Sequence, residues 1–201
     1  MLTREQSNKI PRHFENPIDN IIIDTSYFFG DSFKRNKYTP NMITTLSTIT
    51  GIICIYSYIK QKYIISAIFL VLSYFFDCFD GNFARRYDME TEFGDYYDHL
   101  KDMLFYTILI LLVFYKLRKN KYFIVYLAVY ILLTILGTIF HGCTNIYIRN
   151  KKRKFLDSKT LGTTEKWCYD KPEKLIKKMR YFSMGTAIMY TAFLILVSKY
   201  Q

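Results

Sequence analysis

Cysteine is scarce in this chain, and the few cysteines it has stand far apart. There are four, Cys54, Cys78, Cys143 and Cys168, and no two of them are closely spaced. Disulfide frameworks and zinc sites are recognised by regular, close cysteine spacings. The sequence therefore predicts neither a disulfide framework nor a zinc site.

An apolar leader is also missing, and acidic residues are few. The first 20 residues are polar, so no cleavable secretory signal is expected. The chain has 17 Asp and Glu against 28 Lys and Arg, a net charge of +11, while 51% of its 201 residues are hydrophobic. In so apolar a chain we interpret the basic excess as positive-inside anchoring and contact with anionic lipid headgroups. Nucleic-acid binding would require the apolar blocks to form a soluble core, and no nucleic-acid partner is expected.

The most informative stretch runs from residue 77 to residue 102 and reads DCFDGNFARRYDMETEFGDYYDHLKD. Its spacing is D-x2-D-G-x2-A-R-x8-G-x3-D-x3-D. Four carboxylates stand at fixed intervals in it, and small residues and one arginine lie between them. The acids are Asp77, Asp80, Asp98 and Asp102, and the other fixed positions are Gly81, Ala84, Arg85 and Gly94.

Uncharged apolar runs flank this stretch on both sides, at 63–76 and 103–115. Each run reaches the roughly 20 residues of a spanning helix only by including its pair of acids. An antiparallel pair of such helices would hold all four acids at one depth, just inside one membrane face. Carboxylates at that depth usually pair with each other or with ions, or line a water-filled cavity. A solvated acidic turn would not need the matched helical registers.

The registers place the acids on shared helix faces. Asp77 and Asp80 are three residues apart, and Gly94, Asp98 and Asp102 repeat every four residues. Four converging acids with all-oxygen ligands predict divalent cations, Mg2+ or Mn2+. The small residues leave room for a ligand, and Arg85 supplies a positive fork of the kind that phosphate chemistry uses.

This stretch resembles, position for position, the signature of the CDP-alcohol phosphotransferases (CDP-alcohol phosphatidyltransferases). The resemblance implies that Asp77, Asp80, Asp98 and Asp102 surround two metal ions, the first three as ligands. It implies Asp102, beside Asp98, as the catalytic base that deprotonates the acceptor hydroxyl. Gly81, Ala84, Arg85 and Gly94 would lie against the CDP moiety. A homodimer is implied as well.

The sequence PNMIT at 40–44 resembles a PNxxT feature at the start of the first span in that family. There the asparagine and the threonine face the nucleotide, which implies CDP contacts for Asn41 and Thr44. An ordinary helix start with Thr44 as a surface hydroxyl is the alternative.

We expect an all-α, polytopic membrane helix bundle with five to six transmembrane helices. Residues 1–38 form an N-terminal cytoplasmic or interfacial segment, loosely ordered over 1–20 and then either an amphipathic helix over 21–33 or irregular chain. Residues 39–201 form the transmembrane domain. Its five expected spans are 39–59, 63–85, 95–115, 122–148 and 181–197. A sixth span, usual in the family, would have to lie within 155–178.

Two further features keep alternatives open. His141 and Asn145, four residues apart, either line the active-site cavity or make ordinary hydrogen bonds between helices. The run RNKKRK at 149–154 is either a positive-inside stop or a basic lip that grips an acceptor phosphate or anionic lipid. With the acidic motif cytoplasmic, 20 basic residues lie on the inner side and 7 on the outer side, which favours that orientation. The basic loop at 116–121 argues against it.

The predicted function is transfer of a phosphatidyl or phospho-alcohol group from a CDP-linked lipid or alcohol donor to a hydroxyl acceptor, with release of CMP. CDP-diacylglycerol with a small alcohol fits the short chain. The Asp98–His99 pair is similar to choline and ethanolamine phosphotransferases, which use CDP-choline or CDP-ethanolamine with diacylglycerol. A non-enzymatic divalent-cation transporter would need the four acids but not the arginine and glycines. A degenerate scaffold would not need every motif residue.

Overall fold

The computed structural model describes residues 2–151 and 162–201, and the described residues are helical with no strand. The elements in chain order are α1 (Arg4–Ser7), α2 (Pro17–Arg35), α3 (Pro40–Ile59), α4 (Tyr63–Arg86), α5 (Glu92–Leu117), α6 (Phe123–Asn150), η1 (Gly162–Trp167), α7 (Pro172–Met179), η2 (Arg180–Phe182), α8 (Met184–Val197) and η3 (Ser198–Tyr200). The all-α prediction is confirmed.

Local sequence signals fix where the helices begin. Asn16 accepts a hydrogen bond from the backbone N–H of Ile18 (2.8 Å), and a proline occupies the first turn of α2. Thr39 caps α3 in the same way, again followed by proline. Thr91 caps α5 by accepting from the N–H of Gly94 (3.0 Å). These side chains satisfy donors that a helix start leaves free.

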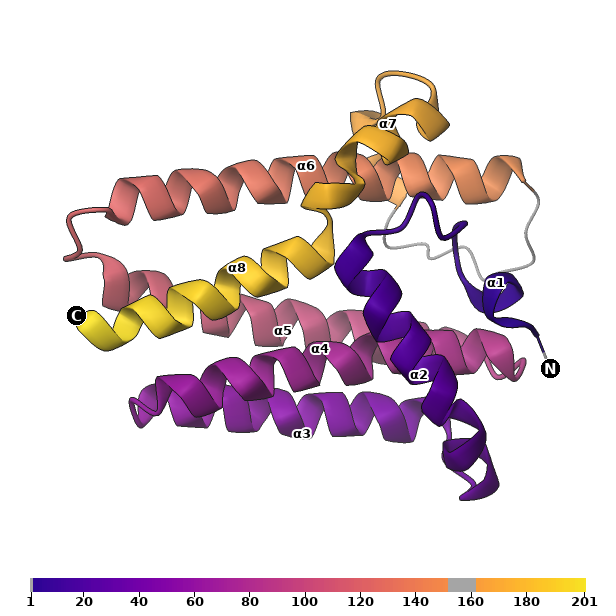
Figure 1. Cartoon of the computed structure of the whole chain (residues 1–201), viewed down its shortest axis with the longest axis horizontal. Helices are drawn as coiled ribbons and strands as arrows, with labels where there is room; N and C mark the ends of the chain where they lie inside the picture. Colours follow the sequence, from indigo (N-terminus) through magenta and orange to yellow (C-terminus); the bar gives the residue numbers. More distant parts are fainter. Residues whose placement is uncertain (1, 152–161) are drawn as a thin grey trace.

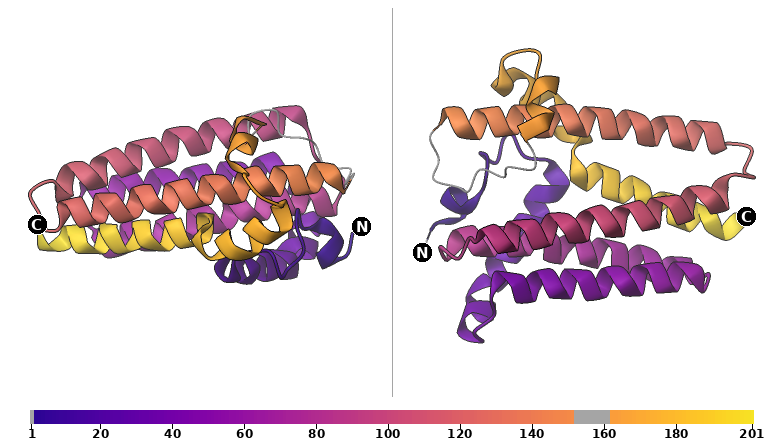
Figure 2. Two further views of the ribbon diagram at one scale, coloured as in Figure 1. Left: turned by 90° about the horizontal axis from the view of Figure 1, so that it is seen from above. Right: turned by 180° about the vertical axis from the view of Figure 1, so that it is seen from behind.

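The long helices run side by side along the longest axis, with the two chain termini at opposite ends (Figure 1). Helices α3 and α4 form a tight antiparallel pair joined by a short turn in which Gln61 has φ 58°. Helix α2 crosses one end of this pair at a steep angle, and α8 packs on α4 (Figures 1 and 2). A buried apolar core that includes Leu70, Leu109, Val113 and Leu194 packs between these helices.

Within the described residues, four helical stretches are long and apolar enough to cross a membrane: α3, α4, α6 and the run Pro172–Tyr200. Most of the apolar surface of α6 faces outward, as at Ile124, Val125 and Leu132. An apolar surface of this size suits lipid contact. Helix α5, which contains the third expected span, is also long but is not among these four, because it carries Lys101 as well as two of the motif's acids. The prediction of a helical membrane bundle is confirmed.

The N-terminal segment corrects the expectation of loose order over residues 1–20. Ser7, Asn8 and Ile10 are almost fully buried, and α2 begins already at Pro17. Of the two alternatives for 21–33, the helix is the one observed. Ile10 packs with α6 residues Phe140 and Cys143, so the polar N-terminus is ordered by contacts with distant helices.

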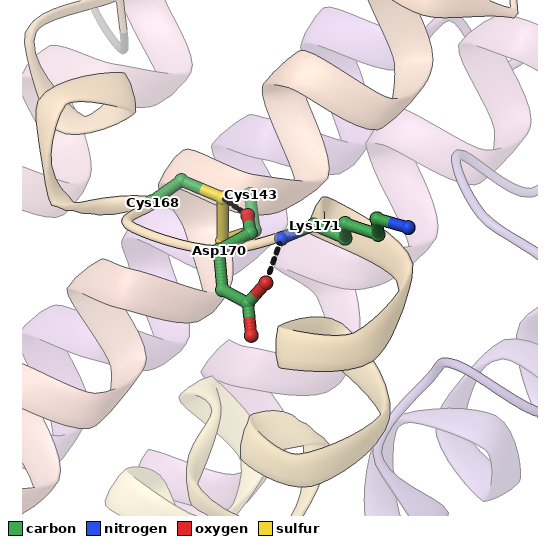
Figure 3. Close-up of a disulfide and its surroundings, with 4 residues drawn as sticks. All are labelled: Cys143, Cys168, Asp170 and Lys171. Atoms are coloured by element: carbon green, nitrogen blue, oxygen red, sulfur yellow. Dashed lines mark hydrogen bonds between the residues drawn. A yellow bond between two sulfur atoms is a disulfide. The ribbon is translucent and has the colours of Figure 1, made fainter.

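The prediction of no disulfide is wrong for one pair of cysteines. Cys143 on α6 is bonded to Cys168, 25 residues further along the chain (Figure 3). The two meet because η1 folds back against α6, where Gly142 allows the approach: a Cβ there would lie 2.1 Å from the carbonyl oxygen of Thr164. Spacing in the sequence carries no signal of this fold-back.

Where a sixth span was expected, within 155–178, the described residues form only short helices, η1 and the amphipathic α7. Residues 152–161, which include the second half of the RNKKRK run, lie outside the described residues. The fifth predicted span corresponds to α8, which begins three residues later than expected, at Met184.

Asp19 anchors α2 to the bundle. Its carboxylate is 7% exposed and accepts hydrogen bonds from the hydroxyl of Tyr74 on α4 (2.8 Å) and from Ser183 before α8 (3.4 Å). Gly185 makes room for it, because a Cβ at that position would lie 2.1 Å from Asp19 Oδ1.

We therefore expect Gly185→Ala to lower the free energy of unfolding by about 1–3 kcal/mol, the usual cost of overpacking. Thermal unfolding in detergent measures it. Gly137→Ala is the matched control, since a Cβ there meets its nearest atom, the carbonyl oxygen of Phe182, at an ordinary 3.5 Å. Equal midpoints for the two variants would contradict this account of Gly185.

Candidate active site

Three of the four motif carboxylates come together where the C-terminal part of α4 meets the N-terminal part of α5. One oxygen from each of Asp77, Asp98 and Asp102 lies within 4.8 Å of the other two. The repeat of four residues puts Asp98 and Asp102 on the face of α5 that turns toward Asp77. Each side chain is mostly buried, with 15% of Asp77 and 28% of the other two exposed.

Asp80 lies deeper and stands apart from that group of three. It is 4% exposed, and its Oδ2 accepts a 2.6 Å hydrogen bond from Thr44 Oγ1 on α3. Thr44 is therefore buried rather than a surface hydroxyl, and its partner is the motif itself. The predicted four-acid cluster is thus three converging acids with Asp80 beside them.

Lys101 is a member of the site that sequence reasoning did not single out. Its side chain is 5% exposed, and Nζ contacts Asp77, Asp98 (3.1 Å) and Asp102 (2.8 Å). Nζ also donates to Ser47 Oγ on α3 at 3.2 Å. The available signal was its spacing, three residues after Asp98 on the same helix. Its long stem carries the ammonium to the three carboxylates.

A first cavity, of about 110 Å³, opens beside this group between α3, α4, α5 and the N-terminal segment. All six residues for which the resemblance implies CDP contacts line it: Asn41, Thr44, Gly81, Ala84, Arg85 and Gly94. Gly94 needs to be small, because a Cβ there would lie 3.0 Å from Asn41 Oδ1 and from Thr91 Oγ1.

The adjacent arginines of the motif have different surroundings. Arg85 lines the first cavity, and its Nε donates to the carbonyl of Ser7 (2.7 Å), which fixes the guanidinium from the N-terminal side. Arg86 points away toward α2, where it pairs with Asp31 (2.9 Å) and stacks over the ring of Tyr27 at 3.8 Å. Arg86 therefore serves the packing of α2 on α4.

A second cavity, of about 340 Å³, adjoins the first and reaches toward α6 and α8. The two cavities share Lys9, Asp80, Gly81, Arg85, Asp98 and His99. Asp77 and Asp102 line only the second cavity, as do Glu15, Asp19, His141 and Ser183. His141 thus lines the predicted cavity, whereas Asn145 is not among the lining residues. The N-terminal contribution to both cavities had no signal in the sequence.

The chemistry of the donor set fits a divalent cation. The converging ligands of Asp77, Asp98 and Asp102 are all oxygens, the type that Mg2+ and Mn2+ prefer. Asp98 Oδ1 and Asp102 Oδ1 are buried and accept no hydrogen bond of normal geometry, although both lie at ion-pair distance from Lys101. Buried carboxylate oxygens in that condition are suited to a cation.

The family model described as CDP-alcohol phosphatidyltransferase matches residues 37–199. The chain belongs to the CDP-alcohol phosphatidyltransferase family. Membership supports a membrane-embedded transferase of phospholipid biosynthesis. The family generally uses divalent metal. No curated protein and no solved structure matches this chain.

Glu15, which lines the second cavity, makes the stability of the protein depend on pH. Burial and, secondly, the nearby carboxylate of Asp19 raise the pKa of Glu15 from 4.5 to about 7. Between these values the folded protein holds a proton that the unfolded chain has lost. The contribution of Glu15 to stability is therefore complete below about pH 4.5 and is lost as the pH rises through about 7.

We expect Glu15→Gln to flatten this dependence, because the amide has no charge to desolvate. The unfolding midpoint of the unmodified protein should fall more between pH 5 and pH 8 than that of the variant. Glu5→Gln, at an exposed position in the same segment, serves as the control and should keep the original slope. A Glu15→Gln slope equal to that of the control would contradict the assignment.

Proposed function

We propose that this protein is an integral-membrane enzyme of phospholipid synthesis that transfers a phosphatidyl group from CDP-diacylglycerol to a small alcohol and releases CMP. One observation carries the proposal: the acidic group lies where a cavity lined by all six expected CDP-contact residues meets a second cavity lined by Asp102. Donor and acceptor then have separate cavities that meet at the carboxylates.

The nucleotide belongs in the first cavity. Gly81, Ala84 and Gly94 leave the backbone open to close approach, as a flat base or a phosphate requires. Arg85, held by the carbonyl of Ser7, lines this cavity and supplies a positive charge for the diphosphate. Asn41 and Thr44 complete the lining from α3.

Asp77, Asp98 and Asp102 would hold divalent cation, with Asp80 as the further acid that the family motif supplies. When bound, two such ions neutralise the diphosphate and stabilise the attacking and leaving oxygens. The hydrogen bond from Thr44 orients the Asp80 carboxylate, and Asp80 lines both cavities.

The acceptor belongs in the second cavity, where Asp102 is the expected general base. Asp102 takes the proton of the acceptor hydroxyl. The hydroxyl oxygen of the acceptor attacks the phosphorus atom that carries the diacylglycerol. The bond from that phosphorus to the bridging oxygen of the diphosphate breaks, and CMP leaves with the electron pair. General bases of this kind contribute about 10²–10⁴-fold to rate.

We further propose that the site faces the cytoplasm. The motif's end of the bundle carries the N-terminal segment, Arg85, Arg86 and α7, whereas the turns at 60–62 and 118–122 and the C-terminus lie at the other end (Figure 1). The basic excess on the motif's side supports that orientation. The homodimer that the family resemblance implies is part of the same proposal.

A second candidate substrate pair is CDP-choline or CDP-ethanolamine with diacylglycerol. One observation favours it: His99, beside Asp98, lines both cavities. A divalent-cation transporter, the rival of a different class, would bind metal with no dependence on a CDP-linked donor.

Purified protein in detergent with Mn2+ tests the function directly. Radiolabelled CDP-diacylglycerol is offered with candidate alcohols one by one, and CDP-choline and CDP-ethanolamine are offered separately with diacylglycerol. We expect CMP release that depends on one acceptor of the first set. Release only in the second set would reassign the donor, and silence in both, with metal bound, would favour the transporter.

Asp102→Asn should lower CMP release by at least about 100-fold, because the amide cannot accept the hydroxyl proton. Asp98→Asn should abolish it at any metal concentration, since a ligand is lost. Asp88→Asn changes an exposed acid outside both cavities and should leave the rate unchanged. Substantial turnover by Asp98→Asn would refute its role.

A further inference from the structure

Lys101 and a divalent cation require the same three carboxylates. Among the described residues, Asp77, Asp98 and Asp102 are the one group of acids close enough to share an ion. The ammonium of Lys101 contacts all three of them. Nζ lies at ion-pair distance from one carboxylate oxygen, Oδ1, of each acid.

The position of Lys101 is held by the fold rather than by solvent. Its side chain is 5% exposed, and Ser47 Oγ on α3 accepts a further hydrogen bond from Nζ at 3.2 Å. Ser47 is itself fully buried and bonded to Ser73 on α4, where Ser47 Oγ donates to the carbonyl oxygen at 2.9 Å. The ammonium therefore lies at the junction of α3, α4 and α5.

A buried positive charge at this point has two opposite effects on the site. Without metal, it relieves the repulsion among three carboxylates that lie within 4.8 Å of one another. When a divalent cation approaches, the same charge repels it and occupies its ligands. A lysine stem is flexible enough for the ammonium to leave while the backbone stays in place.

We propose that Lys101 is a tethered counter-ion that occupies the metal-binding carboxylates of the metal-free protein and competes with divalent cations for them. Metal binding then requires the ammonium to move out of the group. If the proposed function holds, the diphosphate of a CDP-linked donor supplies negative charge that lets metal and ammonium coexist. Metal would accordingly bind more tightly together with the donor than alone.

Equilibrium binding of Mn2+ to the metal-stripped full chain in detergent, without nucleotide, tests the competition. Electron paramagnetic resonance of free Mn2+ gives the Kd. We expect Lys101→Met, which keeps an unbranched side chain of similar length, to bind Mn2+ at least about tenfold more tightly. Lys101→Arg keeps the charge and should stay near the original Kd. Lys62→Met, at an exposed position on the far turn, controls for loss of positive charge in general.

The effect of Lys101→Met on stability without metal should be opposite to its effect on Mn2+ affinity. In excess chelator Lys101→Met should unfold at a lower temperature than the unmodified protein, and saturating Mn2+ should remove that difference. Unchanged or weaker Mn2+ binding by Lys101→Met would overturn the proposal. Weaker binding would mean that Lys101 holds the carboxylates in place for the metal.

The unmodified protein provides a test that needs no variant, should Lys101→Met fail to fold. Acetic anhydride labels accessible lysines, and mass spectrometry reports each site. Labelling of Lys101 should be low in chelator and rise several-fold with Mn2+, while that of Lys62 stays constant. Labelling of Lys101 that does not change with Mn2+ would contradict the displacement of its ammonium by the metal. These measurements involve no turnover, so their failure and a failure of CMP release are distinguishable.

Discussion

The architecture depends on a repulsion that has to be balanced. Three carboxylates converge between two helices just inside one end of an apolar bundle, and a fourth lies beside them. The ammonium of Lys101 offsets the negative charge of the three converging carboxylates, and the hydroxyl of Thr44 donates a hydrogen bond to Asp80. The tight packing of α3 against α4 holds these groups in place. Carboxylates in a bilayer are costly without such partners.

The N-terminal segment belongs to the same arrangement. It packs against the motif's end of the bundle, where the Ser7 carbonyl accepts a hydrogen bond from Arg85, and its Asp19 ties α2 to α4 and α8. Arg86 and Asp31 fix the other end of α2. A segment that is polar in sequence is therefore a wall of both cavities.

The parts that could be predicted from the sequence are those with a local or periodic signal. The long helices α3 to α6 and the shared face of Asp98 and Asp102 follow from spacing along one element. The contact of Lys101 with Asp98 has a local signal, since the two are three residues apart on one helix. The contacts of Lys101 with Asp77 on α4 and Ser47 on α3 had none. Contacts between distant segments had no periodic signal either: Ser7 with Arg85, Asp19 with Gly185, and η1 with α6. The separation of Asp80 from the other acids depends on Thr44, on a third helix.

The bond between Cys143 and Cys168 has a bearing on topology. It lies toward the motif's end of α6, and disulfides are maintained in oxidising compartments but are rare in the cytosol. The basic residues favour a cytoplasmic position for this end of the bundle, whereas the disulfide favours an oxidising compartment. In a glutathione-buffered compartment the two thiols would be free, and η1 would rest on α6 by packing alone. In an oxidising lumen the contact would be covalent, so the oxidation state of this pair reports which aqueous phase the active site meets.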